Sequence, residues 1–138
     1  AGHSVRDAMT EAVKVSPMAS IARAADLMLS RGVKCLCVAE GDKLAGVVGL
    51  RTLVFLERRS RISVVDTSIG RISEELGSLK VSDVMDRDVT TSRLDGELAE
   101  AAELMVERGY GGLPVLDSEG SLAGMVTKTG IVRVLGGV

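Results

Sequence analysis

The sequence is poor in the side chains that carry most catalytic and nucleic-acid chemistry. Its 138 residues include no Trp, one Phe (Phe55), one Tyr (Tyr110) and one His (His3). Proteins that bind single strands stack bases on aromatic rings, and duplex binders carry a net basic surface, whereas this chain has a formal net charge of -2. A Ser-His-Asp triad or a His-rich metal site needs imidazoles, and the single one here is His3, only three residues from the start of the sequence. We therefore expect neither nucleic-acid binding, nor a metal site, nor enzymatic activity.

Long apolar runs and a disulfide framework are also missing. A membrane-spanning helix needs about 18 to 20 consecutive apolar residues, and the longest clean stretch in the middle of the chain covers only residues 44–50, so we expect no membrane span. The two cysteines, Cys35 and Cys37, are two positions apart. In an extended strand they point to the same side and are too far apart to bridge readily. Two free thiols favour a reducing, cytoplasmic location.

What the sequence does contain is an internal repeat. The residues Val5–Met9 (VRDAM) return 76 positions later as Val81–Met85 (VSDVM), and Leu44–Gly46 recurs unchanged as Leu122–Gly124. Self-similarity of this kind indicates two copies of one supersecondary unit. We divide the chain into repeat one at residues 1–60, a connector at residues 61–80 and repeat two at residues 81–138.

Each repeat shows the same order of hydrophobic periodicities. Apolar residues at helical spacing predict an amphipathic helix in each copy (Ile21, Ala24, Ala25 and Met28; Leu98, Ala101, Ala102 and Met105). Gly32 and Gly109 follow these stripes as C-caps. Next come predicted hairpins, at residues 35–39 with 44–48 and 113–116 with 122–126. Short β-prone pieces at 13–15 and 89–91 precede the helices, and helical tails at 52–58 and 130–135 follow the hairpins.

The repeated unit is therefore strand, helix, strand, strand, helix, which predicts an α/β (α+β) fold. One such unit cannot bury its own apolar face, so we expect two β-α-β-β-α repeats packed sheet to sheet with pseudo-two-fold symmetry. The connector is polar and locally basic, with Arg58, Arg59, Arg61 and Arg71 in or beside it. We interpret it as a solvated linker with a short helix near residues 72–76, or alternatively as an edge that attracts phosphate.

In this order and spacing, the chain resembles a tandem pair of cystathionine-β-synthase (CBS) domains, a Bateman module. The resemblance covers nearly all of residues 5–135 and is strongest at Arg108–Asp117 (RGYGGLPVLD) and Leu122–Thr127 (LAGMVT). It implies a regulatory module without catalysis that binds AMP, ADP, ATP or S-adenosylmethionine in clefts between the repeats, with no obligatory cofactor. It also implies a homodimer that tunes an enzyme or a transporter.

The resemblance further implies where a ligand would bind. In the family, a Ser or Thr that faces phosphate and an Asp that holds the ribose hydroxyls lie where the last strand meets the following helix. In repeat two, Thr127 stands at the hydroxyl position and Gly130 stands where Asp is expected. In repeat one, Gly49 replaces the hydroxyl residue and Thr52 the Asp. Neither site matches the family pattern fully.

Cations near the helix starts offer compensation for the missing groups. Lys128 and Arg51 would lie where backbone amides favour a phosphate, and the alternative for each is an ordinary solvated charge. Thr127 is open to being either a phosphate contact or the N-cap of the following helix. The expected ligand-binding residues are Val89, Thr90, Thr91, Gly112, Leu113, Pro114, Thr127, Lys128 and Gly130 in repeat two, and Lys14, Val15, Cys35, Leu36, Arg51 and Thr52 in repeat one.

Three functions stay open from the sequence. The first is an adenosyl sensor whose repeat-two site is the better one. The second is a CBS pair without ligand that serves as a dimerisation or docking scaffold, an alternative that the missing carboxylates keep open. The third is a redox switch through Cys35 and Cys37, although small core side chains are the plainer interpretation. A dimer would bury the helical tails at 52–58 and 130–135, and we expect Tyr110 to have a packing role.

Overall fold

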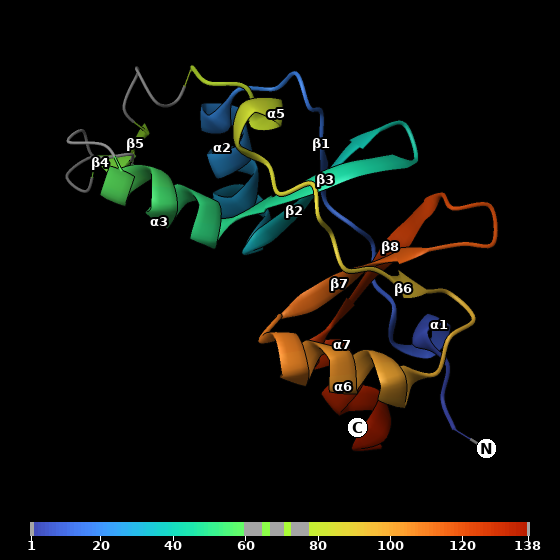
Figure 1. Ribbon diagram of the computed structural model, residues 1–138. Helices are drawn as coiled ribbons and strands as arrows, with labels where there is room; N and C mark the ends of the chain where they lie inside the picture. Colours follow the sequence, from blue (N-terminus) through green and yellow to red (C-terminus); the bar gives the residue numbers. More distant parts are fainter. Residues whose placement is uncertain (1, 60–64, 67–70, 73–77, 138) are drawn as a thin grey trace. The chain divides into compact units, whose positions relative to one another are not determined.

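The chain folds into two compact units, one inserted in the other along the sequence (Figure 1). The computed structural model describes all residues except 1, 60–64, 67–70, 73–77 and 138. The inserted unit comprises residues 13–89, and the split unit comprises residues 1–12 and 90–138. Each unit has its own sheet and its own hydrophobic core, and the two cores share no residue.

The inserted unit holds the three-stranded sheet of repeat one. Its elements are β1 (Lys14–Val15), α2 (Ile21–Arg31), β2 (Cys35–Glu40), β3 (Lys43–Gly49), α3 (Leu50–Arg59), β4 (Val65–Asp66), β5 (Arg71–Ile72) and α5 (Val81–Val84). The strand order is β1-β2-β3, with β1 parallel and β3 antiparallel to β2. The strands β4 and β5 form a separate antiparallel pair.

Local chemistry explains where α2 begins and ends. The Ser20 side chain accepts a hydrogen bond from the Arg23 N–H at 3.1 Å, which satisfies one of the unpaired donors of the first turn. Gly32 ends the helix with a φ of 65°, a left-handed conformation that glycine adopts without a Cβ penalty. The buried face consists of the predicted stripe, Ile21, Ala24, Ala25 and Met28.

The split unit holds the equivalent sheet of repeat two. Its elements are α1 (Val5–Ala8), β6 (Ser92–Arg93), α6 (Leu98–Arg108), β7 (Gly112–Leu116), β8 (Leu122–Thr127) and α7 (Lys128–Leu135). The order β6-β7-β8 repeats the parallel and antiparallel pairings of the first sheet. Gly109 ends α6 at a φ of 69°, as expected, and Tyr110 packs against the core of this unit, which confirms its predicted role.

The short first helix of each repeat belongs to the unit that contains the other repeat's sheet. In the split unit, the Thr10 N–H, just after α1, donates to the Met125 carbonyl at 2.8 Å, and the Met125 N–H donates back at the same distance. In the inserted unit, Asp86 follows α5 and exchanges the same two bonds with Val47, at 2.8 and 3.0 Å. Each sheet is therefore extended at its third strand by a segment that the other repeat supplies.

The mixed α/β fold with two repeated sheets is confirmed, and two local expectations are wrong. Residues 89–91 are not a strand, because β6 is Ser92–Arg93, whose register against Val115 and Leu116 is set by pairing with β7 rather than by local β propensity. Ile72 lies in β5 and not at the start of a helix, and the rest of that expected helix lies outside the described residues. Within the described part of the chain, no helix combines the length and apolar character needed to cross a membrane.

Candidate functional site

The junction between β8 and α7 gathers four of the expected ligand-binding residues. Gly112 pairs with Thr127, the last residue of β8. The Thr127 Oγ1 accepts a hydrogen bond from the Gly130 N–H at 3.3 Å, so Thr127 is the N-cap of α7. The Lys128 N–H donates to the Gly111 carbonyl at 3.1 Å, which ties the start of α7 to the beginning of β7. Thr127, Lys128, Gly112 and Gly130 therefore lie at one strand–helix junction.

Gly130 at this junction is covered by backbone from α1. A Cβ added to Gly130 would lie 2.6 Å from the Ala8 carbonyl oxygen and 3.6 Å from the Thr127 Oγ1. Real Cβ atoms do not approach a backbone oxygen this closely, so position 130 has no room for a side chain while α1 stays in place. The absence of a carboxylate here is therefore a packing requirement of this unit.

The junction between β3 and α3 is built in the same way from repeat one. The Leu50 N–H donates to the Lys34 carbonyl at 3.0 Å, as Lys128 does to Gly111 in repeat two. In repeat one, the hydroxyl that caps the helix belongs to a residue inside the first turn and not to the residue before it. The Thr52 Oγ1 accepts a hydrogen bond from the Gly49 N–H at 3.4 Å. In a capping box, the N-cap side chain accepts from the N–H three residues later, and the side chain there accepts from the N-cap N–H. Thr127 makes the first of these bonds in repeat two, and Thr52 makes the second in repeat one.

The two junctions also differ in which strand of the hairpin carries a side chain and which carries a glycine. Cys35 on β2 pairs with Gly49 on β3, whereas in repeat two the glycine, Gly112, is on the first strand and the side chain, Thr127, on the second. A Cβ added to Gly49 would lie 2.9 Å from the Lys34 carbonyl oxygen, so no hydroxyl residue fits there without a shift of the backbone. Repeat one therefore presents a half-buried thiol where repeat two presents a hydroxyl.

The other expected residues lie along the strands or before them. Leu113 and Pro114 are buried within β7, and Leu36 is buried within β2. Val15 is buried and pairs with Val38.

Lys14 and the segment before β6 have surroundings that the structure describes separately. The Lys14 Nζ makes an ion pair of 3.0 Å with Asp42 in the hairpin turn. Val89 is the last residue of the inserted unit, and Thr90 and Thr91 begin the second segment of the split unit as half-buried irregular chain. The Nζ of Lys14 therefore has a carboxylate partner in the hairpin turn.

Burial disfavours ionisation of both cysteine thiols. Burial, and then the nearby Cys35, raise the pKa of Cys37 from 9.0 to about 12, against a smaller lowering by Lys14. Burial also raises the pKa of Cys35. The thiolate is the reactive and metal-binding form of cysteine, so both side chains are weak nucleophiles and weak ligands at neutral pH. Among the residues that the structure describes, no three His, Cys, Asp or Glu side chains are grouped to hold a metal ion.

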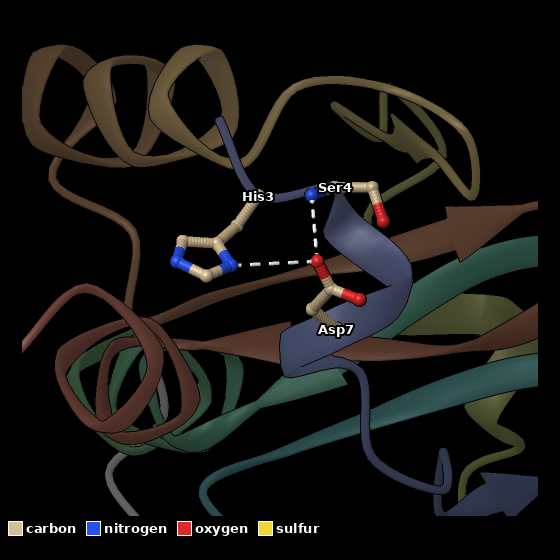
Figure 2. A network of polar contacts seen from close by, with 3 residues as sticks. All are labelled: His3, Ser4 and Asp7. Atoms are coloured by element: carbon tan, nitrogen blue, oxygen red, sulfur yellow. Dashed lines mark hydrogen bonds and ion pairs between the residues drawn. The ribbon is translucent and has the colours of Figure 1, made fainter. Parts of the chain in front are cut away.

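The single histidine belongs to the cap of α1 (Figure 2). The Asp7 Oδ2 accepts a hydrogen bond from the Ser4 N–H at 3.0 Å, and the His3 Nδ1 lies 3.6 Å from the same oxygen. The side chains of both His3 and Asp7 are about half exposed. Asp83 accepts from the Lys80 N–H at 3.2 Å in the same way at α5, so this arrangement is a repeated helix cap.

Comparison with known proteins identifies the repeated unit. Residues 5–59 and 81–137 match the CBS domain family. Inosine-5′-monophosphate dehydrogenase from Thermoplasma acidophilum is 33% identical over 128 residues, which are 93% of this chain and 22% of that enzyme. The chain therefore spans only about a fifth of the length of this relative.

Solved structures share the fold over the whole chain. CBSX2, from Arabidopsis thaliana, in complex with AMP, is 28% identical with a TM-score of 0.75, over 99% of this chain and 98% of CBSX2. The CBS domain pair of protein MJ0100, in complex with 5′-methylthioadenosine and S-adenosyl-L-methionine, is 21% identical with a TM-score of 0.74, over 99% and 98% of the two chains. With both repeats matched and the fold shared throughout, the chain belongs to the CBS domain family and carries two CBS domains in tandem.

Proposed function

We propose that this CBS pair is a non-catalytic regulatory module that binds an adenosyl ligand at its strand–helix junctions. The observation that carries the proposal is the likeness to CBSX2, which is matched over nearly its whole length and was solved with AMP. AMP, ADP, ATP and S-adenosylmethionine are the candidate ligands, none of them an obligatory cofactor.

The chemistry of the junctions supports a ligand with a phosphate. Lys128 and Arg51 lie in the first turns of α7 and α3, and neither turn contains an acidic residue. Backbone N–H groups and the helix dipole favour an anion at such a position. The aliphatic and glycine-rich strands beside the junctions suit an adenine base, which needs apolar walls with few polar groups.

The two units differ in net charge. The inserted unit contains 12 basic and 10 acidic residues, whereas the split unit contains 5 basic and 9 acidic residues. A phosphate therefore meets a more favourable long-range field in the inserted unit, although the hydroxyl of Thr127 is in the split unit. We therefore propose both junctions as binding sites, and the variants Lys128→Ala and Arg51→Ala distinguish them.

The test is a thermal-shift and calorimetric titration with AMP, ADP, ATP and S-adenosylmethionine. A ligand at a hundred times its Kd adds about 2.7 kcal/mol of stability. We expect Lys128→Ala or Arg51→Ala to weaken binding at its own junction, while Arg133→Ala, in the last turn of α7, leaves it unchanged. If no ligand raises the melting temperature at millimolar concentration, the proposal is wrong.

A second candidate function, a dimerisation scaffold, is favoured by apolar side chains left exposed on two helices. Val54 on α3 and Val132 on α7 are 41% and 66% exposed and occupy equivalent positions in the repeats. We propose that a homodimer buries them. Light scattering should show that Val54→Glu with Val132→Glu gives a monomer and that Ser30→Glu, on the exposed side of α2, does not. A monomeric wild-type chain would contradict this candidate.

The regulated partner would be an enzyme or a transporter. In support, the match to this chain covers only 22% of the dehydrogenase relative, so most of that enzyme lies outside the matched region. The cytoplasmic location stays a prediction from the two cysteines.

A further inference from the structure

At each strand–helix junction, the first turn of the helix offers no carboxylate to a ligand's sugar. The first turns of α3 and α7 contain no acidic residue. Carboxylates recognise the hydroxyls of a ribose in proteins because they accept hydrogen bonds and donate none. A nucleotide bound at these junctions therefore meets cations and backbone N–H groups at its phosphate, but no charged acceptor in the first turn for its ribose.

In the split unit, the fold itself keeps a carboxylate out. The Ala8 carbonyl oxygen lies 2.6 Å from the place of a Cβ on Gly130. The helix that carries this carbonyl is firmly held, since Val5 and Ala8 are buried and the Val5 N–H donates to the Gly96 carbonyl at 2.9 Å. No side chain at position 130 can reach a ligand without displacing α1.

In the inserted unit, the equivalent position holds a neutral side chain that already has a partner. Thr52 is half-buried, and its hydroxyl accepts from the Gly49 N–H at 3.4 Å. A hydroxyl in this role is a weaker acceptor for a ribose than a free carboxylate. The two junctions thus lack the same recognition group for different structural reasons.

We propose that this module reads the phosphate and the base of a nucleotide but not its ribose hydroxyls. It therefore takes 2′-deoxynucleotides as readily as ribonucleotides, and it prefers phosphorylated nucleotides to S-adenosylmethionine, which has no phosphate. This inference rests on the proposed function. A charge-assisted ribose contact distinguishes the two sugars by about ten- to a hundredfold in Kd, and this module lacks that contact.

The first experiment titrates the full chain with AMP, 2′-deoxy-AMP, 3′-deoxy-AMP and S-adenosylmethionine by calorimetry. The expected result is that the three monophosphates bind within about twofold of one another and that S-adenosylmethionine binds at least about tenfold more weakly. If AMP binds about tenfold more tightly than its deoxy forms, the inference is overturned while the proposed function stands. If none of the four binds, the proposed function fails and the inference fails with it.

The second experiment restores a carboxylate where there is room for one. Thr52→Asp replaces a side chain of similar size, and Asp7 and Asp83 show that aspartate fits this capping position, accepting backbone N–H groups at 3.0 and 3.2 Å. The expected result is a preference for AMP over 2′-deoxy-AMP of at least about tenfold. Thr52→Asn, of the same shape without the charge, is the matched control and should show a preference below about threefold. An unchanged ratio in Thr52→Asp overturns the inference.

Discussion

The contact between Gly124 and the segment after α1 makes Gly124→Ala the sharpest test of how α1 is held. An added Cβ would lie 2.5 Å from the Thr10 carbonyl oxygen and 2.7 Å from the Met9 Cγ. The methionine side chain can move, but the carbonyl cannot, because it accepts the Met125 N–H at 2.8 Å. The alanine variant must therefore separate β8 from the segment that extends it.

The expected loss follows from the two hydrogen bonds and the added methyl group. Each bond between Thr10 and Met125 contributes about 1 kcal/mol net, and overpacking a fixed backbone costs about 1 to 3 kcal/mol. Because the strain is partly relieved when the bonds break, we expect a total loss of about 2 to 4 kcal/mol in the free energy of unfolding. With a urea m value of about 2 kcal/mol per M, the unfolding midpoint falls by about 1 to 2 M.

The assay is urea unfolding followed by circular dichroism, with hydrogen exchange at Thr10 and Met125 as a local readout. The matched control is Gly111→Ala, because a Cβ at Gly111 meets no atom within 4 Å and its φ is not positive. Its stability should change by less than about 0.5 kcal/mol. If Gly124→Ala is as stable as Gly111→Ala, or if exchange at Thr10 stays slow, α1 is not held as described.

Three further predictions follow from single residues. Because the pKa of Cys37 is raised from 9.0 to about 12, the unfolded chain loses a proton above pH 9 that the folded chain keeps, so stability falls by up to about 1.4 kcal/mol per pH unit between these values. Cys37→Ala should lose less stability than the wild type between about pH 8 and pH 10.5 in urea melts. Asp117→Ala should lose about 1 to 2 kcal/mol, because the Oδ1 accepts two N–H groups of its own turn at 2.9 Å. Asp117→Asn keeps that oxygen, and equal losses for the two variants would contradict the account. Gly32→Ala should lose about 1 kcal/mol at the φ of 65°, and Gly32→Asn should lose less in thermal melts.

The helices and hairpins could be predicted from the sequence because they depend on contacts close along the chain. The stripe from Ile21 to Met28 and the capping Gly32 match α2, whereas in α6, which ends at Gly109, the predicted Ala102 is only half-buried. The helices α1 and α5 were not expected, because four residues are too few to show a period. Each of these helices packs with the sheet of the other repeat because the chain passes from one unit to the other at residues 12–13 and 89–90. No local sequence pattern predicts those two positions.

The candidate site was predictable only in part, for the same reason. The N-cap alternative for Thr127 is observed, since an N-cap bond spans only three residues. The sequence showed that Gly130 replaces the expected Asp but not why, because its partner Ala8 is far away in the chain. The strand expected at residues 89–91 was displaced to Ser92–Arg93 because parallel pairing, not local propensity, determines its register.

The insertion of one unit within the other has a consequence for folding during synthesis. Residues 13–89 contain every residue of one core, so this unit can fold as soon as it has left the ribosome. The helix α1 is made before this unit but finds its core only when residues 90–138 have emerged, and until then the apolar residues of that core do not cover Val5 and Ala8. The helix α1 is therefore synthesised before the inserted unit but folds after it, and a ribosome that stalls between the units leaves α1 exposed to chaperones and proteases.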